Sequence, residues 1–218
     1  MLLETDSAFR CAQLAAEELR VPLAAIFTSE TSSSTCANTS PTAASAGSDI
    51  QGHATHIACT VLNERLQPYR EKLGTSATMA QLAAAAYQDR VELSATGHWA
   101  TPELGYVWNC QEETGPLFAY FTQGVAVNEV EVDVLTGDHT ILRTDIKMDV
   151  GKSISPAIDY GQIEGAFYQG AGWSTIEESL WLRSNGAIFT TGPGTYKIFG
   201  ASDTPQCLNI TLLKNADW

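Results

Sequence analysis

A stretch of hydroxyl, amide and small side chains, residues 29–52 (SETSSSTCANTSPTAASAGSDIQG), constrains the fold of this chain most strongly. Because it holds almost no bulky apolar residue, it cannot be a packed strand or an amphipathic helix over most of its length. An apolar run at 23–27 precedes this stretch, and an amphipathic helical pattern from 50 to 69 follows it. Two interpretations follow: a flexible linker, or a loop whose backbone amides and hydroxyls bind an anion or a cofactor.

The composition argues against several classes of function. A formal net charge of −13 argues against nucleic acid or an anionic membrane as a partner. No apolar run reaches membrane-spanning length, and the N-terminus lacks a signal-peptide pattern. The five cysteines are scattered and form no C-x-x-C pair, which suits free thiols in a reducing compartment: Cys11, Cys36, Cys59, Cys110 and Cys207. With 218 residues, we expect a soluble cytosolic globular piece of one large or two small domains.

The spacing of apolar residues predicts the order of helices and strands. A first helix begins at Ser7, which can cap it, and ends before Pro22. Two further helices follow from 3.6-residue spacing, at residues 50–73 and 78–90, and a fourth is predicted at 157–172 after Pro156, which suits the first turn of a helix. Short apolar runs predict strands at residues 23–28, 91–99 and 208–213, the first of them buried.

The clearest secondary-structure signal is a hairpin between residues 129 and 150. Valines alternate with acidic residues over 129–134, and apolar residues alternate with charged ones over 145–150. A glycine-containing turn at 135–138 separates the two runs, so the pattern predicts an antiparallel hairpin with one solvated face. The pair Asn185-Gly186 predicts a second, final hairpin.

Two groups of polar side chains have the residue types of a functional site. His53 and His56 share a helix face, the geometry of a metal-binding pair, but no third ligand is near them in the sequence. Carboxylates of the hairpin offer a cation site or an acid–base pair, although such groups on the polar face of a strand are usually solvated: Glu129, Glu131, Asp133, Asp145 and Asp149. We favour the structural interpretation for both groups.

The helix predicted at 157–172 is unusually rich in glycine. Each interior glycine costs roughly 0.5–1 kcal/mol relative to alanine, so another element or a ligand is expected to press close to this backbone. Gln162 and Gln169 lie about two turns apart and can point the same way. A glutamine amide offers donors and an acceptor that suit a pterin edge, whereas tight helix–sheet packing is the alternative reason for the glycines.

Two strings carry a resemblance to a known family. Residues 39–45 (TSPTAAS) are similar to a molybdopterin-contacting segment of the xanthine dehydrogenase and aldehyde oxidase family, and residues 161–172 (GQIEGAFYQGAG) are similar to another of its cofactor segments. Supporting matches occur in the family's order at residues 86–90 (AYQDR), 135–138 (LTGD), 142–146 (LRTDI) and 192–197 (GPGTYK). The resemblance covers the chain from about Ser7 almost to the C-terminus.

The resemblance implies an α+β fold in which helices pack on mixed and antiparallel sheets. It identifies residues 1–218 as the later half of a molybdopterin-binding domain, truncated at both ends, with possible sub-parts 1–115 and 116–218. It implies a molybdenum–molybdopterin cofactor, a purine substrate, the remainder of the molybdenum domain as a partner, and a homodimer. FAD, two 2Fe–2S centres and NAD would belong to a missing upstream part. The implied location is cytoplasmic, with peroxisomes as the alternative.

The resemblance also implies roles for individual residues. Ala44 would lie beside the molybdenum, with Ala43 and Ala44 on the substrate side. Thr42 and Ser45 would lie near the pterin, and Gln162 would hydrogen-bond to it. In the family a glutamate takes the proton from a molybdenum-bound hydroxyl, the oxygen attacks an electron-poor carbon, and hydride passes to a sulfido ligand; hypoxanthine and xanthine become urate in this way.

Two expected motifs of the family are missing from this sequence. The catalytic glutamate belongs to a Gly-Glu-Pro-Pro string after the last strand, and Glu177 and Glu178 fall elsewhere in the matched order. No residue here is therefore expected to be catalytic, and the piece alone is expected to be inactive. A Gly-Gln-Gly turn precedes the family's first matching helix, but Thr5 stands at the place of its glutamine. We expect a chain that begins inside a domain, or first residues from a wrongly joined exon.

Three functional interpretations stay open. We prefer a xanthine dehydrogenase type because residues 39–45, 86–91 (AYQDRV) and 145–151 (DIKMDVG) look closer to it. Aldehyde oxidase is the alternative within the family. A non-catalytic binding module, either a decayed paralogue or a scaffold subunit, is the alternative from another class.

Overall fold

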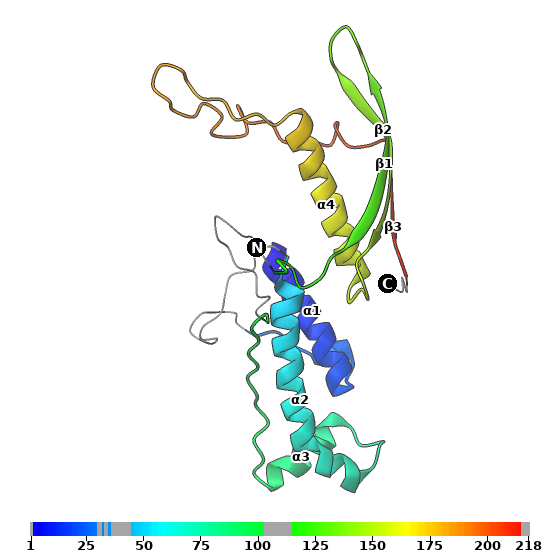
Figure 1. Ribbon diagram of the computed structural model, residues 1–218. Coiled ribbons are helices and arrows are strands. Elements are labelled where there is room, and N and C mark those ends of the chain that lie inside the picture. The colour runs from blue at the N-terminus through cyan, green and yellow to red at the C-terminus, as the bar shows by residue number, and fades with distance from the viewer. Residues whose placement is uncertain (1, 30–31, 33–34, 36–44, 103–114, 215–218) are drawn as a thin grey trace. The chain divides into compact units, whose positions relative to one another are not determined.

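The computed structural model describes residues 2–29, 32, 35, 45–102 and 115–214. The chain divides into two compact units, Met1–Leu117 and Phe118–Trp218, and each is described by itself (Figure 1). The first unit contains helices, and the second contains a sheet with one long helix. The expected α+β fold class is confirmed, because helices and a mixed sheet are both present.

The first unit is built on two long helices, α1 (Leu2–Leu19) and α2 (Gly47–Leu73). Their contacts join distant parts of the sequence. Asn63 of α2 donates a hydrogen bond to the backbone carbonyl of Glu18 at 2.9 Å, and the Glu18 carboxylate contacts His56 Nδ1 at 2.6 Å. A short 3-10 helix, η1 (Leu23–Ala25), follows α1.

The far end of α2 packs against α3 (Met79–Gln88). Four buried side chains form the hydrophobic core there: Leu66, Tyr69, Leu82 and Ala86. Thr78 and Gln81 form a complete capping box at the start of α3, which satisfies backbone donors of its first turn. The predicted helices at 50–73 and 78–90 are therefore confirmed, with starts and ends shifted by a few residues.

Two predictions near the N-terminus are wrong. The first helix does not start at Ser7 but at Leu2, so Ser7 lies inside it instead of capping it. Residues 23–28 do not form a buried strand. Pro22 accepts a hydrogen bond from Ala25 N at 2.8 Å, which closes the 3-10 turn, and Phe27 is 86% exposed. The apolar run therefore pairs with no strand in the described residues, and its aromatic side chain is not buried.

The strand predicted at 91–99 is also wrong. This segment is neither helix nor strand, and it runs in extended form along α2 (Figure 1). Arg65 of α2 donates hydrogen bonds to the carbonyls of Glu92 at 3.1 Å and Ser94 at 2.6 Å. The backbone of these residues is thus satisfied by a helix side chain, where a strand would use a neighbouring strand.

The second unit contains a three-stranded sheet in the order β1-β2-β3. Strands β1 (Gln123–Val132) and β2 (His139–Asp149) are antiparallel, which confirms the predicted hairpin. Strand β3 (Cys207–Leu212) pairs with β2 in parallel, and α4 (Pro156–Thr175) lies between them in sequence and packs against β3. Pro156 occupies the first turn of α4, as expected.

The expectation of a single solvated face on the hairpin is wrong for β1. Every residue of β1 is exposed, including Val125 at 59% and Val127 at 65%. Strand β2 carries the buried positions of the sheet, among them Ile141, Thr144 and Ile146. β2 is the central strand and therefore has neighbours on both sides, whereas β1 is an edge strand.

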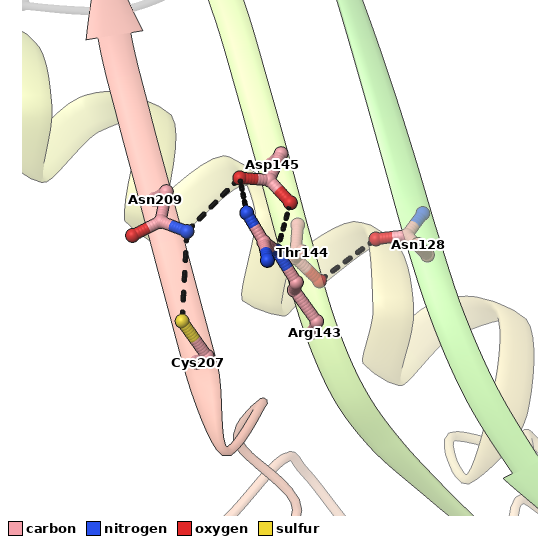
Figure 2. Close-up of polar contacts among 6 residues, drawn as sticks. All are labelled: Asn128, Arg143, Thr144, Asp145, Cys207 and Asn209. Atoms are coloured by element: carbon pink, nitrogen blue, oxygen red, sulfur yellow. Dashed lines mark hydrogen bonds and ion pairs between the residues drawn. The ribbon is translucent and has the colours of Figure 1, made fainter.

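Side-chain hydrogen bonds connect the three strands of the sheet (Figure 2). The fully buried Thr144 of β2 donates a hydrogen bond to Asn128 of β1 at 2.8 Å. Arg143 donates two hydrogen bonds to the Asp145 carboxylate, at 2.5 and 3.0 Å, and Asn209 of β3 donates a third at 2.9 Å. The Thr144–Asn128 bond joins β2 to β1, and the Asn209–Asp145 bond joins the parallel strand β3 to β2.

The hydrogen bonds of Asp145 predict how the stability of the second unit changes at low pH. Hydrogen bonds from Arg143, and then from Asn209, hold the pKa of the Asp145 carboxyl below its ordinary value. Its stabilising effect is therefore present above the unfolded pKa of about 4 and is lost as the pH falls through the folded pKa. We expect Asp145→Asn to lower the melting temperature at neutral pH, and the difference from the wild type to close in acid. Thermal unfolding followed by circular dichroism down to about pH 2 tests this.

A matched control is Glu131→Gln, which removes an exposed carboxylate of β1. This variant should keep the pH dependence of the wild type. If the melting temperatures of Asp145→Asn and the wild type differed by the same amount at every pH, the prediction would be contradicted.

The segment between α4 and β3 is attached to the C-terminal end of α4. Tyr196 donates a hydrogen bond to the Glu177 carboxylate at 2.5 Å, and the Tyr168 and Phe199 rings lie 6.3 Å apart. The predicted hairpin around Asn185-Gly186 is reduced to one antiparallel bridge between Trp181 and Ile188.

Candidate functional site

Of the five residues predicted to contact a cofactor, Thr42, Ala43 and Ala44 lie outside the described residues. Ser45 is exposed and has a φ of 57°, a left-handed conformation that is uncommon for a residue other than glycine. Ala46 follows as the N-cap of α2. Ser45 is therefore the point at which the chain turns into α2.

The start of α2 is held against α1. Arg10 Nη1 donates a hydrogen bond to Ser48 Oγ at 2.5 Å. Gly52 is buried, and a Cβ atom added there would lie 3.2 Å from Leu14 Cδ1. This close packing holds the first turns of α2 against α1, and Ser45 directly precedes those turns.

Gln162, the fifth predicted residue, lies on α4 in the second unit and is exposed. Within the described part of the chain its amide has no hydrogen-bond partner. Gln169 is exposed on the same helix. Both amides are therefore available to a group outside the described residues.

The glycines of α4 leave open space along the helix. A Cβ atom added at Gly161, Gly165 or Gly170 would meet nothing within 4 Å among the described residues. Only Gly172 shows the expected close approach, because a Cβ there would lie 2.5 Å from Glu177 Oε1. The backbone of α4 near Gln162 is therefore accessible to a planar group with carbonyl, amine and ring-nitrogen edges. These residues fit a pterin in their hydrogen-bonding chemistry.

The alternative functional groups have structural roles. His53 Nδ1 donates to its own helix at the Asp49 carbonyl, at 2.8 Å, and His56 pairs with Glu18. Among the residues that the structure describes, no group of three or more histidine, cysteine or acidic side chains could hold a metal ion. In the same residues, no helix is both long and apolar enough to cross a membrane. Cys11, Cys59 and Cys207 are free thiols.

Sequence reasoning did not find two long-range contacts that shape the candidate regions. One is the stack of Trp99 on His53, with ring centroids 4.5 Å apart, and the other is the Glu177–Tyr196 hydrogen bond. The only sequence signal for the first was Gly97 in an otherwise strand-like run, since glycine inside such a run often marks close backbone approach.

Comparisons with known proteins give close relatives. Xanthine dehydrogenase of Emericella nidulans is 60% identical over 205 residues, which are 94% of this chain and 15% of that protein. Nicotinate hydroxylase hnxS of the same organism is 59% identical over 200 residues, covering 90% of this chain and 15% of that protein. The chain thus spans about 15% of the length of these curated relatives.

Solved structures show the same fold at lower sequence identity. CO dehydrogenase from Oligotropha carboxidovorans matches with a TM-score of 0.73 and 20% identity, over 93% of this chain and 26% of that chain. The model of one family, the molybdopterin cofactor-binding domain, matches residues 7–205. Since this match covers most of the sequence, the chain belongs to the molybdopterin cofactor-binding domain family.

Proposed function

We propose that this chain is part of a molybdenum hydroxylase of xanthine dehydrogenase type, which oxidises hypoxanthine and xanthine to urate. The observation that carries the proposal is the 60% identity to a xanthine dehydrogenase over 94% of the chain. The relatives are several times longer, so the activity belongs to the complete enzyme. The catalytic glutamate of this family has no counterpart among the matched strings of the present sequence.

The part of this chain in the reaction is to hold and orient the cofactor. When bound, the molybdenum–molybdopterin cofactor supplies the redox chemistry and the oxygen-transfer chemistry. We propose that Thr42 and Ser45 bind the pterin from the loop before α2, and that Gln162 binds it from α4. Small side chains at Ala43 and Ala44 leave space for the substrate. The exposed amide of Gln162 and the open glycine positions beside it support this assignment.

The remaining parts of the complete enzyme follow from the same proposal. FAD and two 2Fe–2S centres on other domains carry electrons to NAD. The complete enzyme is a homodimer in the cytoplasm, with peroxisomes as an alternative location. Its purine substrate binds between this part and the remainder of the molybdenum domain.

A second candidate is hydroxylation of a pyridine carboxylate. The nicotinate hydroxylase is 59% identical to this chain, almost the same value as the xanthine dehydrogenase. Purines and nicotinate are both electron-poor nitrogen heterocycles, so the same cofactor chemistry serves either. Aldehyde oxidation is the remaining alternative, and a non-catalytic binding module is the alternative outside enzymes.

The test uses the complete enzyme that contains this chain, purified from a host that makes the molybdenum cofactor. Xanthine, hypoxanthine, nicotinate and an aromatic aldehyde are supplied in parallel with NAD. We expect molybdenum near one atom per chain and urate from xanthine. Turnover of nicotinate alone favours the second candidate, and absence of both molybdenum and turnover contradicts any enzymatic role.

Gly165→Ala separates folding from cofactor binding. An added Cβ there meets nothing within 4 Å, so replacing glycine in a helix should stabilise α4 by roughly 0.5–1 kcal/mol. If the pterin approaches this backbone, the same variant of the complete enzyme should retain less molybdenum. Urea unfolding of the chain and molybdenum content of the enzyme are the two measurements. A more stable variant with full molybdenum content would place the cofactor elsewhere.

A further inference from the structure

Among the described residues, the N-cap of α2 makes no side-chain hydrogen bond of the kind that stabilises many helix starts. Its N-cap residue is Ala46, and no side chain bonds to the first turn from that position. Helix α3 differs, because Thr78 and Gln81 form a full capping box. The first backbone N–H groups of a helix have no partner inside it, so a helix whose N-cap side chain forms no such bond depends more on its other contacts.

Helix α1 supplies one set of such contacts. Arg10 bonds to Ser48, and Leu14 packs on Gly52. One turn further, Glu18 contacts His56 at 2.6 Å. These contacts join the first turns of α2 to α1.

The extended segment 91–99 supplies the second set (Figure 1). Near the start of this segment, the carbonyls of Glu92 and Ser94 accept hydrogen bonds from Arg65 of α2. The segment continues to Gly97, whose backbone lies so close to α2 that an added Cβ would sit 1.9 Å from the Ala54 carbonyl oxygen. It reaches Trp99, whose ring stacks on His53 with 15° between the ring planes.

The Trp99 contact is transmitted to the first turn of α2. His53 Nδ1 hydrogen-bonds the Asp49 carbonyl at 2.8 Å, which fixes the orientation of the imidazole that Trp99 covers. Asp49 lies in the first turn of α2. Gly47 and His53 are separated by about 9 Å of helix at 1.5 Å per residue. The stack is therefore close to the point where the chain turns at Ser45.

We propose that the segment 91–99 is a strap that holds the first turns of α2, whose N-cap Ala46 contributes no side-chain cap. Gly97, Trp99 and His53 hold the first turns of the helix and thereby fix the direction of the backbone at Ser45. Trp99 and His53 are positioning residues, since neither is expected to touch substrate or cofactor. The consequence for the cofactor rests on the proposed function, which assigns the preceding loop to pterin binding.

The test compares three variants of the complete enzyme by hydrogen–deuterium exchange and by molybdenum content. Trp99→Ala removes the stack, and exchange in the first three turns of α2 should become about tenfold faster, with α3 unchanged. Trp99→Phe keeps a stacking ring and should restore slow exchange. Arg65→Met releases only the far end of the strap and should leave the first turns of α2 as in the wild type. Molybdenum content should fall at least about twofold in Trp99→Ala only.

Each other outcome has a clear meaning. Unchanged exchange in Trp99→Ala overturns the strap, and so does equal acceleration in α3, which would show a general loss of stability. Equal effects of Trp99→Ala and Arg65→Met overturn the assignment of the holding contact to Trp99. Local acceleration with wild-type molybdenum content supports the strap but contradicts the cofactor assignment of the preceding loop.

Discussion

Replacing Ala44 by Leu is expected to lower the turnover of the complete enzyme by at least about a hundredfold. We propose that the Ala44 methyl group faces the open side of the metal, where the substrate carbon must approach. A larger side chain would displace the substrate or the cofactor, and a misplacement of about 1 Å is enough for a loss of this size. Steady-state kinetics with xanthine, together with flavin and iron–sulfur spectra, measure the effect.

Flavin and iron–sulfur content should remain unchanged, because those groups belong to other domains in the proposed enzyme. The matched control is Ala24→Leu, the same chemical change at an exposed position of η1. Surface substitutions of that kind usually change stability by no more than about 0.5 kcal/mol, so this control should keep normal turnover. Normal turnover in Ala44→Leu would contradict the assignment of Ala44 to the substrate side of the metal.

The second large effect is expected at Gly97. An alanine Cβ there would lie 1.9 Å from the Ala54 oxygen and 2.9 Å from its carbonyl carbon, and neither atom can rotate away because both belong to a helix backbone. We expect Gly97→Ala to destabilise the first unit by about 3 kcal/mol, the upper part of the usual range for overpacking. Its thermal unfolding should shift down by roughly 10 °C.

The opposite sign is expected for Gly165→Ala, where the added Cβ has free space. Measuring both variants in the same chain separates a specific clash from the general preference for alanine over glycine. A Gly97→Ala chain that melts with the wild type would mean that the segment 91–99 can leave α2 at no cost.

Local sequence patterns predicted the elements whose stability depends on near neighbours. The hairpin followed from alternation on both sides of a glycine turn, and α2 and α3 followed from helical spacing. Patterns failed where a distant partner decides the structure. Residues 91–99 have a strand-like composition, but their partners are Arg65 and Ala54 of a helix. No local pattern contains that information.

The candidate site shows the same division. Gln162 and its neighbouring glycines could be singled out because their types and spacing are visible in one helix. The left-handed backbone at Ser45 and the position of Ala46 as the N-cap of α2 could not be predicted, because serine and alanine are not typical of those positions. Resemblance to a family supplied the proposed roles of Thr42, Ala43 and Ala44, which periodicity and composition alone would have left as part of a polar stretch.

The parallel pairing of β3 with β2 has a consequence for the order of folding during synthesis. The hairpin of β1 and β2 can form soon after Asp149 leaves the ribosome, because its contacts are local. Strand β3 begins only at Cys207, after α4 and a long irregular segment. At a synthesis rate of about 5–20 residues per second, β2 has an open edge for several seconds. During this interval the open edge of β2 can pair with another chain, as unpaired strand edges do.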